Sequence, residues 1–308
     1  MIGRILASAL GPRFWVTGYV FLILGLVLPG EWSGLKPTVP LLLGGILFFS
    51  FLRLPFAEVV GVVGDRRRWA AACWLAVLKL LAIPGAVWLL MRGISPEWAA
   101  GMLLVACMPA GLTSIALTDL QRGDRAQALL LVVLTSFLAP VSVPMLLTLL
   151  TGASPDPGAV AGRALYILAL LVVPFVAAQA MRALFPGPVA RHQAQWSRGS
   201  IACAMLLVGA SVLAVRGAWA GTPALSLLWP LLLTIIASLV AVAAIWLVAR
   251  RSSRAETVAF ACGAIYVNNG LAVAFAVQFY PGDAHMVLPA ILIQVPMLAL
   301  IALLPGRT

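Results

Sequence analysis

Long apolar runs divide this chain into ten segments, with only short charged stretches between them. A membrane-spanning helix needs about 20 mainly apolar residues, because the hydrocarbon core of a bilayer is about 30 Å thick. Only 9% of the 308 residues are charged and the mean hydropathy is +1.09, whereas about a quarter of the residues of a soluble domain are charged. The sequence therefore predicts an all-α polytopic membrane protein, and it excludes a soluble enzyme and a nucleic-acid-binding protein. The ten expected spans lie at residues 13–30, 38–60, 69–91, 97–119, 126–150, 160–182, 198–215, 224–249, 257–279 and 284–304.

The basic residues are divided unequally between the two sides of the membrane that a ten-span path defines. Lys36, Arg92, Arg163 and Arg216 fall on one side and Lys79 falls inside a span, whereas the rest of the 20 lysines and arginines fall on the other side. Basic residues gather in cytoplasmic loops. We therefore expect both termini in the cytoplasm and the chain in the inner membrane of a bacterial cell.

Short motifs recur in the same order in the two halves of the chain. The matched spans would run in opposite directions, so the pattern predicts two inverted five-helix repeats, residues 1–155 and 156–308. Inverted repeats are typical of secondary transporters. The recurring motifs are Ala-Val-Trp-Leu at 86–89 with Ala-Ile-Trp-Leu at 244–247, Ala-Cys at 106–107 and 261–262, and Val-Pro-Met-Leu at 143–146 and 295–298.

Two of the expected spans, 97–119 and 257–279, carry helix-breaking residues near their centres. Backbone groups freed by a break must be satisfied by protein or by a water-filled cavity, and the amino-terminal ends of half-helices attract anions. We therefore expect a substrate or ion site at these breaks. The alternative is a kinked helix whose asparagines bridge to neighbouring helices. The expected substrate-binding residues are Pro109, Gly111, Thr113, Ser114, Asn268 and Asn269.

Lys79 is the basic residue that falls in mid-span. It lies about 16–20 Å from either end of its span, at a rise of about 1.5 Å per residue, so its side chain cannot reach the headgroups and must face protein or water. Asp119 and Asp124 lie nearer a span end, and no span carries an acidic residue at the depth of Lys79. Three roles remain open: proton coupling, a fixed charge in the place of a lost cation, and direct attraction of an anionic substrate.

Several motifs near the breaks occur together in one known family. The motif Pro-Ala-Gly-Leu-Thr-Ser at 109–114, the pair Gly-Asp at 123–124, Leu-Ala-Pro at 138–140 and the Asn-Asn-Gly-Leu-Ala motif at 268–272 resemble those of helices 4, 5 and 9 of bile acid:sodium symporters. The resemblance implies crossing broken helices 4 and 9, with organic anions bound in a crevice between two domains. The implied panel domain comprises spans 13–60 and 160–215, and the implied core domain comprises spans 69–150 and 224–304.

The same resemblance implies that the sodium ligands of the family are largely missing. The positions that carry side-chain oxygens in the family hold Ile115, Ala128, Val132, Gly263 and Val267 in this chain. Sodium requires several hard oxygen ligands, so sodium coupling of the familiar kind is in doubt. We therefore expect no cofactor, and a bound sodium ion is doubtful.

Lys79 itself stands where the resemblance places a sodium-liganding glutamine, five residues before Pro84. Its ammonium could fill the space of a sodium ion, held by carbonyl oxygens of the broken helices and by asparagine oxygens. The expected coupling or cation site consists of Lys79, Ser114 and Asn268.

These features together predict a secondary transporter that moves a bile-acid-like or other small carboxylate by alternating access, either independently of sodium or coupled to protons. The expected partners are this anion and membrane lipid, with no nucleic acid and no required protein partner. The alternatives are a sodium-coupled organic anion symporter with altered sites and an uncoupled or arsenite-type exporter. An intramembrane enzyme would need a nucleophile–base pair or paired carboxylates at mid-membrane depth, and a channel would need a repeated filter motif. The sequence shows neither.

Overall fold

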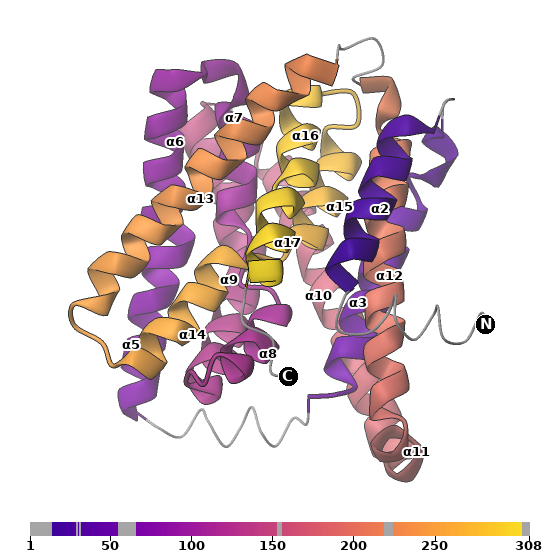
Figure 1. Ribbon diagram of the computed structural model, residues 1–308, viewed down its shortest axis with the longest axis vertical. Helices are drawn as coiled ribbons and strands as arrows, with labels where there is room; N and C mark the ends of the chain where they lie inside the picture. Colours follow the sequence, from indigo (N-terminus) through magenta and orange to yellow (C-terminus); the bar gives the residue numbers. More distant parts are fainter. Residues whose placement is uncertain are drawn as a thin grey trace.

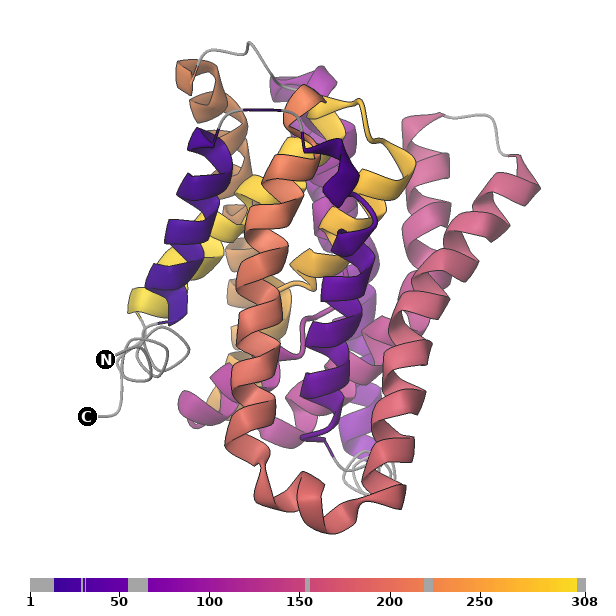
Figure 2. The same ribbon diagram turned by 90° about the vertical axis from the view of Figure 1, so that its right-hand side faces the viewer.

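The computed structural model describes residues 14–28, 30, 32–54, 66–152, 156–218 and 224–303, and within these residues the regular structure is helical apart from one isolated bridge (Figures 1 and 2). Each of the ten expected spans corresponds to one helix or to two consecutive helices, although residues 13, 29, 55–60 and 304 of these spans lie outside the described residues. The helices are α2 (Phe14–Val27), α3 (Thr38–Phe51), α5 (Arg66–Val77), α6 (Ile83–Ile94), α7 (Pro96–Cys107), α8 (Thr113–Leu120), α9 (Arg125–Thr151), α10 (Pro157–Leu184), α11 (Pro186–Arg191), α12 (Gln193–Ala214), α13 (Leu228–Ala249), α14 (Arg254–Ile265), α15 (Asn269–Phe279), α16 (Ala284–Leu292) and α17 (Gln294–Leu303).

The lengths and apolar surfaces of these helices suit a bilayer. Large apolar side chains such as Leu41, Leu89 and Phe137 are exposed on the outside of the bundle, where lipid can cover them. The chain is therefore a multi-pass membrane protein. The described residues contain six helical segments that are long and apolar enough to cross a membrane, namely Ser33–Phe51, Arg68–Ile94, Arg125–Thr151, Pro157–Leu184, Gln193–Ala214 and Leu228–Ala249, and shorter apolar helices at Val16–Val27, Pro96–Cys107, Asn269–Phe279 and Ala284–Met297.

The helices pack into two groups. In the first helix group (α2, α3, α10 and α12), α12 lies against both α2 and α3, and α10 lies against α3. In the second helix group (α5 to α9 and α13 to α17), α7 packs between α6 and α16, and α14 packs against α8, α9 and α13. The groups meet where α15 contacts α3 and α12 and where α10 runs along α9. In Figure 1, α2, α3 and α12 lie on the right, while α5, α6 and α13 lie on the left.

Acidic side chains begin several helices. Asp124, Asp156 and Asp283 accept hydrogen bonds from the first backbone N–H groups of α9, α10 and α16. Ser253 and Glu256 form a capping box at the start of α14. A carboxylate in this place satisfies unpaired donors and faces the positive end of the helix dipole. Four of the acidic residues within the described ranges therefore fix helix ends.

Candidate functional site

The two breaks predicted from the sequence lie against each other. The α7–α8 pair and the α14–α15 pair are each interrupted by a short extended stretch, and an antiparallel bridge joins Ala110 in one stretch to Val267 in the other. This pairing supplies hydrogen-bond partners to backbone groups that the break in each helix leaves unpaired. Such partners are required where a helix is interrupted at membrane depth. The hydrogen bonds beside the bridge run from Gly111 N–H to Tyr266 O (2.8 Å) and from Asn268 N–H to Pro109 O (2.8 Å). We call this arrangement the crossover.

Gly111 permits the close approach of the two extended segments at the crossover. A Cβ atom at this position would lie 2.9 Å from the carbonyl oxygen of Tyr266 and 3.0 Å from that of Val267. These atoms belong to the backbone and cannot swing aside. Glycine is therefore required here for a steric reason, and the backbone of Gly111 faces the extended segment between α14 and α15.

Thr135 of α9 supports the crossover from behind. The hydroxyl of Thr135 accepts a hydrogen bond from Ala110 N–H at 3.1 Å and donates one to Leu131 O at 2.7 Å. Its side chain is fully buried. Thr135 was not predicted from the sequence, although a hydroxyl in mid-span is a signal that could have indicated it.

Gly263 is packed tightly beside the crossover. A Cβ atom there would lie 2.6 Å from Cδ2 of Leu131 and 3.5 Å from Cβ of Ala110. The resemblance placed a sodium-liganding glutamate at this position. As the helices pack in this structure, neighbouring side chains fill the space that a longer side chain would need.

A cavity of about 440 Å³ lies between the two helix groups, and the crossover forms one of its walls. Residues of α3 and α12 line the opposite wall. Arg53, which follows α3, and Arg125, the first residue of α9, also line the cavity, and both are exposed. We call this end of the molecule the Arg53 end. The α8 and α15 helices start at the cavity, so the positive ends of two helix dipoles face it.

The structure brings some of the predicted substrate residues together and leaves others out. Gly111, Thr113, Asn268 and Asn269 line the cavity. Pro109 lies outside its lining and contributes a carbonyl oxygen to the crossover. Ser114 also lies outside the lining. Its side chain is fully buried, and its hydroxyl has no hydrogen-bond partner among the described residues.

The two adjacent asparagines have different surroundings. Asn268 is the N-cap of α15, and its Oδ1 accepts a hydrogen bond from Leu271 N–H at 3.2 Å. Asn269 is 9% exposed, and its Oδ1 has no partner within the part of the chain that the structure describes. Asn268 is therefore committed to the helix start, whereas Asn269 keeps an unpaired polar atom at the cavity wall.

Lys79 lies behind α7 in a π-helical turn, Leu78–Ala82, that joins α5 to α6. Its side chain is 1% exposed, and its Nζ donates a hydrogen bond to Ala106 O at 2.9 Å. Ala106 belongs to the last turn of α7, where the helix dipole is negative. Single π-helical turns often occur at functional sites.

The ammonium of Lys79 has no acidic partner within the described ranges, where the ion pairs are those of Arg68 with Asp124 and of His285 with Asp283. The other two residues of the predicted cation site, Ser114 and Asn268, make no hydrogen bond to Lys79 in this structure. The carbonyl end of α7 is therefore the partner that stabilises the buried charge.

Several residues of the cavity were not predicted from the sequence. Arg53 and Arg125 contributed only to the predicted orientation, and the serines of α3 and α12 carried no prediction. Ser200 of α12 donates to Ile46 O at 3.2 Å, and its hydroxyl lies 3.0 Å from that of Ser50. A serine in an otherwise apolar span was the available signal. Gln294, at the start of α17, also lines the cavity.

The fold and the site define a multi-pass membrane protein with broken helices that meet at a cavity. The chain belongs to the SBF-like CPA transporter family, which matches residues 14–307. This membership confirms the resemblance to bile acid:sodium symporters, and the family is one of transporters rather than enzymes.

Two curated bacterial proteins are similar to parts of the chain. The first, described as "Uncharacterized sodium-dependent transporter YocS" of Bacillus subtilis, is 26% identical over 150 residues, which cover 45% of this chain and 43% of that protein. The second, "Uncharacterized protein PA2026" of Pseudomonas aeruginosa, is 31% identical over 139 residues, which cover 44% of this chain and 41% of that protein. The chain thus matches less than half the length of each of these relatives.

Proposed function

We propose that this chain is a secondary transporter that moves a small organic anion, bile-acid-like or another carboxylate, through a bacterial inner membrane by alternating access. The observation that carries the proposal is the cavity, which both helix groups and both helix breaks enclose. The amino-terminal ends of α8 and α15 each carry about half a positive charge and attract anions. In this proposal the first helix group is the panel domain and the second is the core domain.

The proposed topology has ten spans in two inverted repeats, with both termini and the Arg53 end in the cytoplasm. The unequal distribution of basic residues supports this orientation. The break between α7 and α8 in the first half and the break between α14 and α15 in the second half support the repeat. A reporter inserted after Asp156 should then respond from outside the cell, and a reporter beside Arg251 should respond from the cytoplasm. The opposite pattern would overturn this topology.

The proposed substrate contacts are those predicted residues that line the cavity. Thr113 and Asn269 present polar side chains there, whereas the backbone N–H and C=O of Gly111 are already hydrogen-bonded to Tyr266 O and Ser114 N–H. Asn268 acts through α15, because its Oδ1 fixes the start of that helix. A carboxylate can accept hydrogen bonds from the side chains of Thr113 and Asn269 near the positive helix ends.

We further propose that transport does not require sodium, because Lys79 supplies a positive charge at the place that the family resemblance assigns to a sodium ligand. Its burial and its hydrogen bond to Ala106 O support this role. The contact lies at the carbonyl end of α7, where a cation compensates the helix dipole. If Lys79 also releases a proton during the cycle, transport is coupled to protons.

The experiment is uptake of organic acids by reconstituted vesicles in sodium, potassium and choline buffers, from acidic to alkaline pH. Wild-type uptake should be the same in all three cations. A pH dependence that the Lys79→Arg variant loses would show proton coupling, and a flat response would show a fixed charge. A strong requirement for sodium would overturn the assignment of Lys79.

Matched variants separate the charge of Lys79 from its shape. Lys79→Met should abolish uptake and lower thermal stability, because the carbonyl end of α7 loses its cation. Lys79→Arg keeps the charge and should retain part of the stability. Lys36→Met changes the other lysine of the chain, near the start of α3, and should have no effect. Full activity of Lys79→Met would contradict the proposal.

A second candidate function is a sodium-coupled organic anion symporter. The observation in its favour is the name of the Bacillus subtilis relative, which describes that protein as sodium-dependent. The same cation series decides between the two candidates. Uptake that increases with sodium in both the wild type and Lys36→Met would favour the symporter.

A further inference from the structure

The wall of the cavity that faces the crossover carries polar side chains of its own. Ser50 of α3 and Arg53, which follows α3, lie beside Ser197 and Ser200 of α12. All four line the cavity, and the three serines are half-buried. The other residues of α3 and α12 that line the cavity are apolar. The four residues therefore form a distinct polar patch, which we call the Arg53 cluster.

The paired serines of the Arg53 cluster can offer a hydrogen-bond donor to a ligand. The hydroxyl oxygens of Ser50 and Ser200 lie 3.0 Å apart, and Ser200 donates to Ile46 O at 3.2 Å. Each hydroxyl has one hydrogen. When Ser200 donates to Ser50 instead, the hydrogen of Ser50 becomes available to the cavity. Ile46 lies inside α3, where a carbonyl also accepts from the backbone N–H four residues further on, so it keeps a partner.

The side chain of Arg53 is directed to the cavity and not to the end of its own helix. Basic residues near a helix end often donate to the last carbonyls. At the end of α3 a residue of α10 does so, since Arg182 donates to Leu52 O at 2.6 Å. The guanidinium of Arg53 donates to the hydroxyl of Ser197 at 3.3 Å. A guanidinium has five N–H donors, so one bond to Ser197 leaves others for a ligand.

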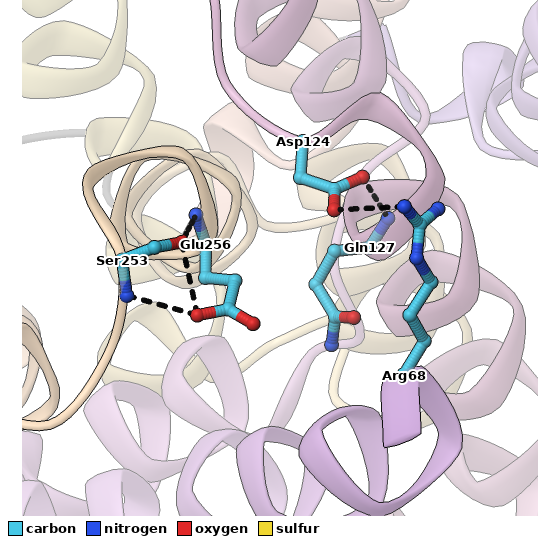
Figure 3. Close-up of polar contacts among 5 residues, drawn as sticks. All are labelled: Arg68, Asp124, Gln127, Ser253 and Glu256. Atoms are coloured by element: carbon cyan, nitrogen blue, oxygen red, sulfur yellow. Dashed lines mark hydrogen bonds and ion pairs between the residues drawn. The ribbon is translucent and has the colours of Figure 1, made fainter. Parts of the chain in front are cut away.

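Carboxylates of the second helix group are engaged away from the cavity. Asp124 accepts a hydrogen bond from Gln127 N–H at 3.0 Å and forms an ion pair with Arg68 at 3.6 Å (Figure 3). Glu256 accepts hydrogen bonds from the backbone N–H and the hydroxyl of Ser253. The lining residues include no carboxylate within the described part of the chain. An anion at the Arg53 cluster therefore meets no acidic side chain of that lining.

The Arg53 cluster is separated from the crossover along α3. Leu43 marks the level of the crossover, because a Cβ atom at Gly270 would lie 2.8 Å from its Cδ1. Ser50 follows two helical turns later, which corresponds to about 10 Å at a rise of about 1.5 Å per residue. Residues at this spacing share one helix face, and Leu47 between them also lines the cavity. The cavity thus has polar groups at two places, with apolar side chains between them.

We propose that the Arg53 cluster is a second anion subsite and that the substrate is a dianion, with a carboxylate at each end of an apolar chain. This inference rests on the proposed transport function. One carboxylate accepts hydrogen bonds from Thr113 and Asn269 at the crossover, and the other binds Arg53 and the hydroxyl of Ser50. Hydrogen bonds between a guanidinium and a carboxylate are charge-assisted, and the planar guanidinium matches the geometry of a carboxylate.

The two subsites belong to different helix groups. The crossover is part of the second group, whereas α3 and α12 of the first group carry the Arg53 cluster. A dianion therefore bridges the two groups, while a monoanion of the same length is held by its charge at one wall only. The dianion is bound tightly only while both walls are within its reach, so its binding responds to the relative movement of the groups.

Suberate and its monomethyl ester test the second subsite, because the ester has the same chain and lacks one charge. Binding is measured by isothermal titration calorimetry on the wild-type protein in detergent at neutral pH. Suberate should bind about tenfold more tightly than the ester, since a hydrogen bond to a charged group contributes enough for this factor. Succinate is too short to reach from Asn269 to Ser50 and should bind no more tightly than the ester.

Two variants remove the second subsite. The preference for suberate over the ester should be lost in Arg53→Gln and reduced in Ser50→Ala/Ser200→Ala. Both variants should bind the ester as the wild type does, which shows that the protein is folded and the crossover intact. The controls are Arg198→Gln, an exposed arginine of α12 outside the cavity lining, and Ser238→Ala, a serine of α13 outside it. Both controls should keep the preference.

The outcomes separate this inference from the proposed function. Equal binding of suberate and the ester to the wild type, or an unchanged preference in Arg53→Gln, would overturn the second subsite and leave the proposed transport of an organic anion in place. Tighter binding of succinate than of suberate would show that a dianion does not bridge the two walls. A wild-type protein that binds none of the three probes would instead overturn the anion site at the crossover, and the inference with it.

Discussion

The boundary between the two helix groups differs at its two ends. At the Arg53 end the boundary holds the cavity. At the opposite end, which we call the Arg163 end, α10 of the first group packs against α15 of the second. Tyr166 donates a hydrogen bond to Ala274 O at 3.3 Å, and its ring lies edge-on to Phe279 at 5.2 Å. The guanidinium of Arg163 lies 5.4 Å from the ring of Tyr280.

The difference shows how one pair of helix groups can be open at one end and closed at the other. The contacts at the Arg163 end are few, and each is worth about 0.5–2 kcal/mol. Contacts of this size can break and form again during a transport cycle. The Arg53 end has two exposed arginines at the cavity, Arg53 and Arg125, in place of aromatic contacts. The two ends therefore differ in the chemistry of their side chains.

The largest expected effect comes from a larger side chain at the crossover, which forms a wall of the cavity between the two helix groups. A side chain at Gly111 would meet the backbone carbonyls of Tyr266 and Val267, so Gly111→Val should destabilise the protein by about 3 kcal/mol and abolish transport. Thermal unfolding in detergent measures the loss. Gly85→Ala is the control, because a Cβ there meets no atom within 4 Å. A Gly111→Val protein of normal stability would show that the crossover is looser than described.

A smaller effect is expected from loosening the closed end. Arg163→Gln removes two cation–π contacts, with Phe279 and Tyr280, worth about 1–2 kcal/mol together. A cysteine that replaces Ala204, which lines the cavity, should then react about tenfold faster with a membrane-impermeant thiol reagent in right-side-out vesicles, since 1.4 kcal/mol corresponds to a factor of ten. Arg92→Gln removes a cation–π contact with Trp88 within α6 and should leave the rate unchanged. If both variants behave alike, the aromatic contacts do not hold this end closed.

The two asparagines at the cavity wall should respond differently to the same substitution. Asn268→Ala removes the cap of α15 and should cost about 1 kcal/mol of stability. Asn269→Ala removes a side chain whose Oδ1 has no partner among the described residues, so stability should be kept while substrate binding is lost. Thermal unfolding and binding of an organic acid, measured on both variants, test the distinction. Equal losses of stability would place Asn269 among the structural residues.

The smallest effect is expected at Ser114, which lies behind the wall of the cavity. Ser114 is fully buried, does not line the cavity, and carries a hydroxyl without a hydrogen-bond partner in the described ranges. Ser114→Ala should change stability by less than about 1 kcal/mol, because no hydrogen bond is lost, and should leave transport unchanged. Uptake assays check this directly. A strong loss of uptake would return Ser114 to the substrate site or the cation site that the sequence predicts.

Much of the fold could be predicted because apolar length and helix-breaking residues are local properties. The spans at 126–150 and 160–182 correspond closely to α9 and α10. The breaks near Pro109 and Asn268 also lie where the sequence placed them. The distinction between Asn268 and Asn269 could not be predicted, since both have the same side chain and differ only in which backbone groups surround them.

The sequence by itself determined that this is a membrane protein, because the chain has few charged residues and its long apolar segments are suited to the lipid bilayer and not to water. It also determined that Lys79 faces protein or water inside the molecule and not the headgroups, since its side chain is too short to reach either interface from mid-span. Only the tertiary structure decided its partner, the carbonyl of Ala106 at the end of another helix. In the same way, only packing placed Arg53 and Arg125 at one cavity, although they lie far apart in the sequence. Contacts between distant segments depend on how helices assemble, and the local pattern of residues does not contain that information.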